Sequence, residues 1–506
     1  RDDGVVVFLN GTEVFRSNMP TGTVTYTTFA SVALDVPAES TPVAAGAEAG
    51  LLVEGMNVVA VEIHQANLTS SDISFNLELR AGPPVVTRGP YLQDGTTSGV
   101  VIRWRTDQPT NSRVRFGTSR DDLSGIVDNA TMTREHIVAV VGLEADTKYY
   151  YSIGSSASRL AGGDANHFFR TSPLAGRDKP TRVWVLGDSG TANANARAVR
   201  DAYRNFAASR PADLMLMLGD NAYTNGTDQE YQAAVFDMYT TAMMQAVLWP
   251  TLGNHDALSA YSTTQSGVYY DIFTLPKNGE AGGLASGTEA YYSFDYANIH
   301  FICLDSQDTN RSPTGAMMMW LENDLASTAQ DWVVAYFHHP PYTKGSHDSD
   351  SLTDSGGRMV EMRENVLPVL EAGGVDLVLT GHSHSYERSY LLDGHYGYST
   401  ALTPQMKLNS GDGREDGDGA YAKPEGGPAA HAGAVYVVAG SSGQTSGGTL
   451  NHPAMYISWN KLGSLILDVQ GNRFDAKFID NTTAVQDYFT MIKGSGARTT
   501  TIWVVD

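Results

Sequence analysis

The sequence contains a single cysteine, Cys303, among 506 residues. One cysteine cannot form an intrachain disulfide, and it cannot supply a thiolate zinc site or a Cys-x-x-Cys redox motif. Because Cys303 lies in the apolar run 300–304, we expect it to be a small buried hydrophobe. The cysteine count therefore excludes a fold held together by disulfides or thiolate metal sites.

Basic residues are also scarce. The chain has 34 Lys and Arg against 56 Asp and Glu, a formal net charge of −22. A strongly acidic surface repels polyanions, so we expect neither a nucleic-acid-binding surface nor a polybasic membrane anchor. An anionic substrate would need positive charge supplied locally, at its own site.

Long hydrophobic runs are absent as well. No apolar stretch approaches the roughly 20 residues that a membrane-spanning helix needs. The chain opens with Arg1-Asp2-Asp3 rather than with a basic segment followed by an apolar one, so no signal peptide is recognisable in it. We expect a soluble chain without a membrane span.

The residues that are present indicate a globular protein of several domains. The hydrophobic share is 42% and the 51 Gly and 20 Pro are spread along the chain, and at about 150 residues per domain this length gives roughly three domains. Short alternating strands within 1–80, among them 5–9, 58–63 and 73–79, predict a small β-sandwich accessory module. A Gly-Pro-Pro break follows, and strands at 99–105, 113–117, 136–141 and 148–154 predict a second β-sandwich over 84–174.

From residue 178 the pattern changes. Apolar strands alternate with segments of helical period at 192–210, 228–247, 315–326 and 358–372, which predicts an α/β domain over 178–493 built from βαβ units. Residues 494–506 form a C-terminal tail in this division. The predicted fold class is therefore two N-terminal β-sandwich modules followed by an α/β sandwich domain.

Five segments of the α/β region share one design, in which an apolar strand runs into a loop that begins with a potential metal ligand. The segments end in Gly187-Asp188-Ser189-Gly190, Gly219-Asp220-Asn221-Ala222-Tyr223, Gly253-Asn254-His255-Asp256, His338-His339 and Gly381-His382-Ser383-His384. Ligands bind at strand ends in open α/β sheets. Carboxylate, imidazole, amide and phenolate ligands without sulfur suit iron, zinc or manganese, and two such ions roughly 3.5 to 4 Å apart can clamp a phosphate for in-line attack. The pattern points to hydrolysis of a phosphate ester.

These five blocks, in this order, resemble those of the metallophosphoesterases (the calcineurin-like phosphoesterase superfamily) and specifically of the purple acid phosphatases. The wider superfamily has a histidine two residues after the first aspartate, whereas this chain has Gly190 there and has Tyr223 after the second block. The resemblance implies a phenolate ligand to ferric iron. It extends upstream, because Arg88-Gly89-Pro90-Tyr91-Leu92 is similar to the start of the fibronectin-type-III-like domain that precedes the catalytic domain in this family.

The resemblance also implies a ligand set. An Fe(III) site would use Asp188, Asp220, Tyr223 and His384, and a second site for iron, zinc or manganese would use Asp220, Asn254, His338 and His382, with Asp220 bridging. His255 would face the bound phosphate, and Asp256 would orient His255 by accepting its other N–H. His347 stands where the family places a histidine that contacts phosphate or protonates the leaving group, but here Asp348 follows it in place of a second histidine.

The function expected from these residues is hydrolysis of small phosphate monoesters by attack of a metal-bound hydroxide. A phosphodiesterase or nucleotidase would use the same metals, so the motifs leave that alternative open. A third alternative, from another class, is an extracellular protein whose residues 1–80 contact a glycan or a neighbouring domain. The resemblance also implies a secreted or periplasmic location.

Overall fold

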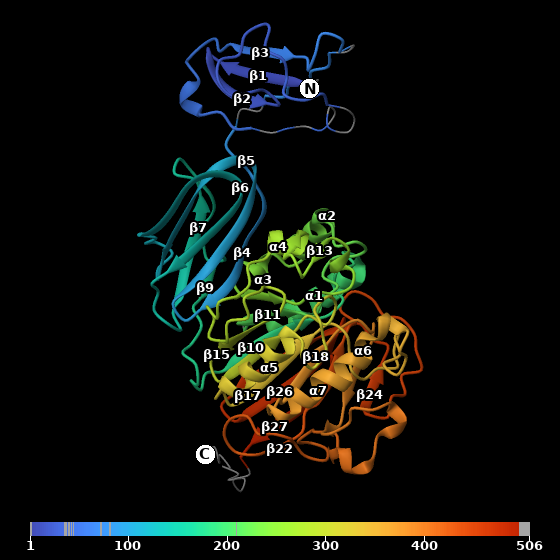
Figure 1. Ribbon diagram of the computed structural model, residues 1–506. Helices are drawn as coiled ribbons and strands as arrows, with labels where there is room; N and C mark the ends of the chain where they lie inside the picture. Colours follow the sequence, from blue (N-terminus) through green and yellow to red (C-terminus); the bar gives the residue numbers. More distant parts are fainter. Residues whose placement is uncertain are drawn as a thin grey trace.

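The computed structural model describes residues 3–494 apart from 35–37, 39–40, 42, 44, 71–72, 80–81 and 209. The predicted tail at 494–506 lies outside the described residues except for Gly494. Figure 1 shows the order in space: a small N-terminal sheet, a domain of long strands beneath it, and a large domain packed beside the second. No described helix combines the length and the apolar character that crossing a bilayer requires.

The N-terminal region contains one antiparallel sheet among its described residues. Its strands, in the order β2-β1-β3, are β1 (Gly4–Leu9), β2 (Thr12–Ser17) and β3 (Val59–His64), and a 3-10 turn covers Ala49–Leu51. Asn10 and Gly11 join β1 to β2 with positive φ at both positions, as a tight hairpin turn requires.

Two expectations for this region differ from the structure. A sandwich needs a second sheet, and the described part of 3–79 holds only the one. The strand predicted at 73–79 is not formed. Ile73 and Leu79 are 67% and 65% exposed, so the alternating apolar residues there have no partner sheet to cover them.

The second domain is a six-stranded antiparallel network. Its strands are β4 (Val86–Thr96), β5 (Gly99–Gly117), β6 (Gly125–Val141), β7 (Lys148–Gly154), β8 (Arg159–Gly162) and β9 (Phe168–Arg170). The segments predicted at 99–105 and 113–117 are the two ends of the long strand β5, whose pairing with β6 shifts register between them. The first end pairs with β4 and the second with β7, and buried Ile102, Trp104, Val114 and Tyr151 form the core between them.

Two mixed seven-stranded sheets build the large domain. One has the order β12-β11-β10-β25-β26-β27-β22 and the other the order β15-β16-β17-β18-β23-β19-β24. The first consists of β10 (Thr181–Leu186), β11 (Leu214–Met217), β12 (Val247–Pro250), β22 (Tyr421–Lys423), β25 (Gly463–Gln470), β26 (Arg473–Asp480) and β27 (Val485–Lys493). The second consists of β15 (Tyr292–Tyr296), β16 (Ile299–Cys303), β17 (Trp332–Phe337), β18 (Leu377–Thr380), β19 (Tyr386–Ser389), β23 (Val435–Ala439) and β24 (Met455–Trp459). Short pairs add β13 (Ala260–Tyr261) with β14 (Ser266–Gly267) and β20 (Leu391–Leu392) with β21 (Lys407–Asn409).

Short helices follow the parallel strands. They are α1 (Ala194–Ala207), α2 (Asp228–Tyr231), α3 (Thr240–Met243), α4 (Val268–Ile272), α5 (Ala316–Ser327), α6 (Arg358–Glu361) and α7 (Leu367–Ala372), with π-helical turns at Gln232–Phe236 and Met362–Val366. Further 3-10 turns cover Asp256–Leu258, Asp354–Gly357, Ser399–Ala401 and Pro404–Met406. The helix predicted over 228–247 is interrupted and ends in strand β12, whereas α6, a π-turn and α7 together fill the segment predicted at 358–372.

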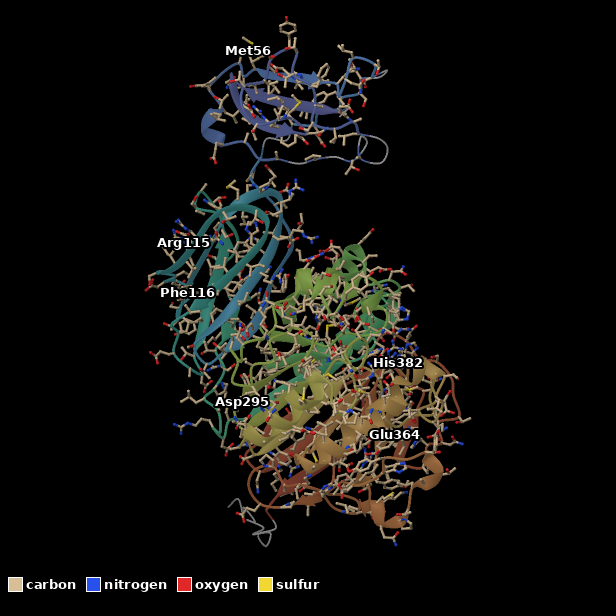
Figure 2. The ribbon with its side chains drawn as sticks, viewed as in Figure 1. Met56, Arg115, Phe116, Asp295, Glu364 and His382 are labelled. Atoms are coloured by element: carbon tan, nitrogen blue, oxygen red, sulfur yellow. The ribbon has the colours of Figure 1, made fainter. Side chains whose placement is uncertain are left out.

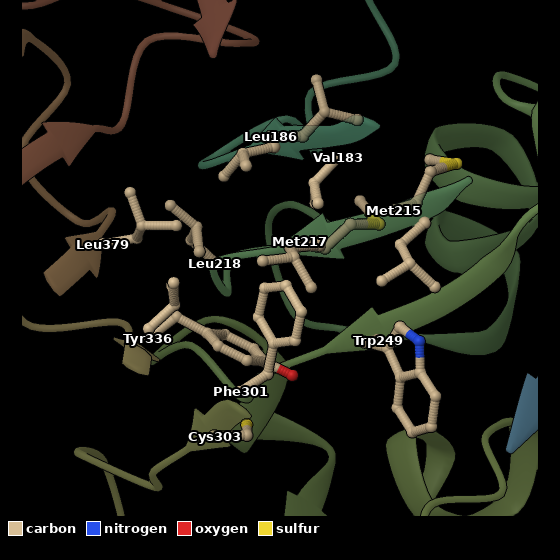
Figure 3. Packing of buried hydrophobic residues seen from close by; sticks show 14 of the residues in the cluster. Val183, Leu186, Met215, Met217, Leu218, Trp249, Phe301, Cys303, Tyr336 and Leu379 are labelled. Carbon is tan, nitrogen blue, oxygen red and sulfur yellow. The ribbon is translucent and has the colours of Figure 1, made fainter. Parts of the chain in front are cut away.

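The core of the large domain lies between the two sheets. The rings of Trp249 of β12 and Phe294 of β15 stack across the two sheets with centroids 3.9 Å apart, and Figure 3 shows Phe301, Tyr336 and Leu379 of the second sheet in the same core. Cys303 is fully buried in this core, as expected, and burial raises the pKa of its thiol to about 12. A close-packed interior of this kind fixes where the strands end, and the strand ends carry the site.

Candidate metal centre

The five predicted ligand segments emerge at the carboxyl ends of parallel strands. Strands β10, β11 and β12 are parallel neighbours in one sheet, and β17 and β18 are parallel neighbours in the other. Asp188, Asp220 and His382 follow their strands with positive φ values of 53°, 52° and 66°. This backbone region is uncommon for residues other than glycine and concentrates at functional sites, where surrounding structure holds it in place.

Two glycines explain how the segments approach so closely. A side chain at Gly219, whose φ is +89°, would lie 2.6 Å from Nδ1 of His338. A side chain at Gly190 would lie 2.5 Å from the backbone nitrogen of Ala222. The position where the wider superfamily has a histidine is therefore filled by the backbone of the second loop, which carries Tyr223.

The first predicted ligand set converges on the Tyr223 hydroxyl. This group donates to Oδ2 of Asp220 at 2.9 Å and to Oδ1 of Asp188 at 3.1 Å, and it lies 3.2 Å from Nε2 of His384. Nε2 of His384 is itself 3.6 Å from Oδ1 of Asp188. The four side chains thus place two carboxylates, a phenol and an imidazole around one point.

The second predicted set surrounds Nε2 of His338. This nitrogen lies 3.0 Å from Oδ1 of Asn254, 3.2 Å from Nδ1 of His382 and 3.4 Å from Oδ1 of Asp220. Asp220 therefore presents one oxygen to each set. Asp188, Asp220 and His338 also form a group whose candidate ligand atoms all lie within 4.8 Å of one another.

Each imidazole of the two sets has its remaining nitrogen held by an outer group. Nδ1 of His338 lies 2.8 Å from the Leu218 carbonyl, and Nδ1 of His384 lies 3.0 Å from the Ser446 hydroxyl. Nε2 of His382 lies 2.6 Å from the hydroxyl of Ser355. Such outer contacts fix ring orientation and leave the opposite nitrogen available as a ligand.

The two buried carboxylates of the site have histidine neighbours but no Lys or Arg partner among the described residues. Asp188 and Asp220 are 0% and 2% exposed, and among the described residues no Lys or Arg forms an ion pair with either. Burial together with the two carboxylates raises the pKa of Tyr223 well above its usual range. Burial and the neighbouring imidazoles of His339 and His338 hold the pKa of His382 well below its usual range.

His255 lies beside Asp220, but Asp256 does not orient it. Nδ1 of His255 contacts the Thr224 carbonyl at 2.6 Å, and its Nε2 is 3.9 Å from Oδ2 of Asp220. The Asp256 carboxylate is fully buried and instead accepts hydrogen bonds from the Tyr231 hydroxyl at 2.6 Å and from the backbone of Gly253 at 2.9 Å. The predicted contact between Asp256 and His255 is therefore wrong, because the turn directs this carboxylate inward, beneath the loop.

His347 stacks on His382, with ring centroids 3.9 Å apart and planes 20° apart. Its Nδ1 lies 2.8 Å from Oδ1 of Asp354, a carboxylate that also accepts from the Ser355 hydroxyl at 2.8 Å. Neither Asp354 nor Ser355 is predicted as a site residue from the sequence. They lie in a loop with no strand before them, and Ser355 has a positive φ of 51° that only the folded chain reveals.

His339 packs against the second ligand set without being part of it. Its ring lies 4.4 Å from that of His382, and its Nδ1 is 2.9 Å from the Ser306 hydroxyl. Figure 2 shows His382 within the large domain, on the far side from Asp295. Together these contacts define one centre, built from both sheets of that domain.

Two protein-family models match the segments that form this centre and the domain before it. The calcineurin-like phosphoesterase family model matches residues 181–386, and the model of the purple acid phosphatase N-terminal domain matches residues 90–171. The two matches cover most of the second domain and all five ligand segments of the large domain. The matched relatives include purple acid phosphatases, a family that implies a dinuclear metal site.

Two relatives illustrate the similarity of this chain to curated proteins. Purple acid phosphatase 15 of Arabidopsis thaliana is 28% identical over 346 residues, which cover 60% of this chain and 61% of that protein. Acid phosphatase type 7 of Mus musculus is 26% identical over 340 residues, covering 61% of this chain and 72% of that protein. The match thus spans about three fifths of the length of the plant relative.

Solved structures share the fold of this chain. The purple acid phosphatase PPD1 from yellow lupin seeds superposes with a TM-score of 0.61 at 16% identity, covering 82% of this chain and 75% of that one. PhoD superposes with a TM-score of 0.54 at 15% identity, covering 82% of this chain and 92% of that one. At these identities the likeness establishes the architecture alone.

Proposed function

We propose that this chain hydrolyses phosphate monoesters at a dinuclear metal centre. The observation that carries the proposal is the convergence of the two side-chain sets on Asp220, one oxygen of which faces Tyr223 and the other His338. The shared carboxylate is the arrangement expected of a residue that bridges two cations.

The donor set fits a pair of metal ions. Buried carboxylates are strongly unfavourable unless they are paired or coordinate a cation, and Asp188 and Asp220 have no Lys or Arg partner among the described residues. We propose that Asp188, Asp220, Tyr223 and His384 would hold Fe(III), and that Asp220, Asn254, His338 and His382 would hold Fe, Zn or Mn. When bound, such ions polarise phosphoryl oxygens and lower the pKa of water.

The chain's own residues would orient the substrate and move its protons. His255 donates through Nδ1 to the Thr224 carbonyl, which leaves Nε2 facing the site, where the imidazolium form donates to a phosphoryl oxygen. His347 is fixed through Nδ1 by Asp354, which leaves Nε2 to give a proton to the departing alkoxide. The side chains of both histidines are 29% exposed, so each is reachable from solvent.

Several finer assignments belong to the same proposal. We take 1–80, 84–174 and 178–493 as an accessory module, a fibronectin-type-III-like domain with β-sandwich character and the catalytic domain. We take the protein as secreted or periplasmic, with a glycan or a neighbouring domain as the contact of residues 1–80.

The test measures initial rates on p-nitrophenyl phosphate and bis-p-nitrophenyl phosphate with metal-loaded protein. We expect the monoester to be hydrolysed much faster. Asn254→Ala should abolish the activity, since its amide oxygen lies in the second set, while Asn323→Ala, at an exposed position of α5, should leave the activity unchanged. Faster hydrolysis of the diester would favour the phosphodiesterase or nucleotidase alternative. Absence of metal-dependent turnover of either substrate would favour a binding role.

A further inference from the structure

The second domain contacts the large domain through an ionic contact beside the helix that follows the Tyr223 loop. Arg88 and Arg105 both donate to the carboxylate of Asp228, the first residue of α2. The Arg88 distance is 2.8 Å, and Arg105 binds both oxygens at 2.6 and 2.8 Å. The Arg88 side chain is fully buried, and its Nε also donates to Gln232 at 2.8 Å. In Figure 1 the second domain lies beside the end of the large domain where α2 and α4 are found.

The next residues of α2 hold the loop that bears Tyr223. The Glu230 carboxylate accepts from the backbone nitrogens of Thr224 at 2.6 Å and Asn225 at 3.0 Å, and it forms a capping box with Thr227. The carbonyl of the same Thr224 contacts Nδ1 of His255. The backbone between Tyr223 and α2 is therefore held from the α2 side and in turn orients the imidazole.

A second contact from α2 reaches the loop that bears Asn254. The Tyr231 hydroxyl, fully buried, donates to Asp256 at 2.6 Å. Asp256 accepts from the backbone of Gly253 and Asn221, the neighbours in sequence of Asn254 and Asp220. One turn of helix thus holds the two loops that carry three predicted ligands and the substrate-facing histidine.

We propose that the second domain is a positioning element of the phosphoesterase centre, acting through Arg88, Arg105 and Asp228 on α2. Catalysis of this kind depends on holding side chains in one geometry, and a misplacement of about 1 Å can cost on the order of 100-fold in rate. The proposal rests on the proposed function, since it assigns His255 its role there. It gives residues 84–174 a part in the reaction although they contribute no ligand.

The first test is a double-mutant cycle on kcat. Asp228→Asn removes the charge that both arginines bind, and we expect it to lower kcat at least about tenfold. In a His255→Ala background the same substitution should lower kcat by a clearly smaller factor, because the route through Thr224 and His255 is gone and only the route through Tyr231 and Asp256 remains. A reduction by the same factor in both backgrounds would overturn the proposal, since a purely structural contact gives additive effects.

A matched control uses another Arg–Asp pair of the same strand. Arg113 of β5 binds both oxygens of Asp128 at 2.7 and 2.8 Å, as Arg105 binds Asp228, but this pair lies within the second domain. Figure 2 places its neighbour Arg115 on the side of the domain away from the large domain. Arg113→Met should leave kcat unchanged. Arg105→Met should lower kcat as Asp228→Asn does, and it replaces Asp228→Asn in the test if that variant folds poorly.

The second test needs no enzymatic activity and therefore separates this inference from the proposed function. Hydrogen exchange on the full chain should show faster exchange of the Thr224 and Asn225 amides in Asp228→Asn and Arg105→Met than in Arg113→Met. Exchange in β17 should stay unchanged, which distinguishes local release from global destabilisation. Unchanged exchange at residues 224–225 in both variants would refute the positioning role even if the wild-type chain proves to be an active phosphatase.

Discussion

Replacing Asp487 by alanine is expected to destabilise the large domain by about 3 to 5 kcal/mol. The Asp487 carboxylate is fully buried and accepts from Nε and Nη2 of Arg388 at 2.6 and 3.0 Å. It also accepts from the Tyr386 hydroxyl at 2.7 Å and from Arg414 at 2.9 Å. Burial raises the pKa of this carboxyl. The hydrogen bonds and charges of Arg388 and Arg414, with the Tyr386 hydroxyl, together lower it by more, so the pKa lies below its ordinary value.

The size of the effect follows from what the substitution leaves behind. Arg388 is 0% exposed, and without Asp487 its charge would retain the Tyr421 oxygen at 3.3 Å and the ring of Tyr456 at 4.7 Å. Neither group neutralises a buried cation. Removing one partner of a buried pair is costly for this reason, even where replacing both by apolar residues is tolerated.

The measurement is the free energy of unfolding from urea titration followed by tryptophan fluorescence. Asp128→Ala is the control, because Asp128 binds Arg113 with similar geometry while its side chain is half exposed, and such pairs contribute little. A loss below about 1 kcal/mol in Asp487→Ala, the size typical of an exposed pair, would refute the reasoning. It would mean that water or a rearranged side chain reaches Arg388.

Three further predictions concern a spectrum, a metal affinity and a pH dependence. Tyr223→Phe should abolish the visible absorption band of the metal-loaded protein without changing its far-UV circular dichroism, because the phenolate ligand is lost, while Tyr261→Phe, at an exposed position, should keep the band. Ser355→Ala should weaken binding of the second metal ion by about 10- to 100-fold in a chelator competition, since the Ser355 hydroxyl holds Nε2 of His382; unchanged affinity would contradict this role. Burial lowers the pKa of His300, but contacts with Asp295 and Asp324 more than offset it and raise that pKa to about 9. The resulting stability should be complete below about pH 6.5 and be lost as the pH rises through about 9, whereas His300→Gln should show no such decline in urea titrations at each pH.

Most of the candidate centre is predictable because its residues obey local rules. Each ligand segment pairs an apolar strand with a glycine and a polar side chain, and parallel strands bring their carboxyl ends to one edge. Asp188, Asp220 and Asn254 follow adjacent strands of one sheet, so their proximity needs no detailed knowledge of the loops. The burial of Cys303 follows from its apolar neighbours in the same way.

The errors fall where a residue's surroundings come from distant segments. Asp256 follows His255 in sequence, yet it bonds Tyr231, which is 25 residues away. The alternating segment 73–79 lacks a partner sheet, which its own sequence could not reveal. Asp354 and Ser355 gain their importance only because a turn brings them to His347 and His382.

The sequence by itself determined the chemistry of this protein: which side chains can bind metal ions, the order of the strands that carry them, and the strong negative charge that they must work against. Those properties depend on residue type and short-range spacing. Only the tertiary structure decided which oxygen of Asp220 faces which set, and that a second domain holds α2 against both loops. These features depend on contacts between residues more than a hundred positions apart, as between Arg88 and Asp228. Such contacts form only when the domains pack, so short-range spacing in the sequence does not reveal them.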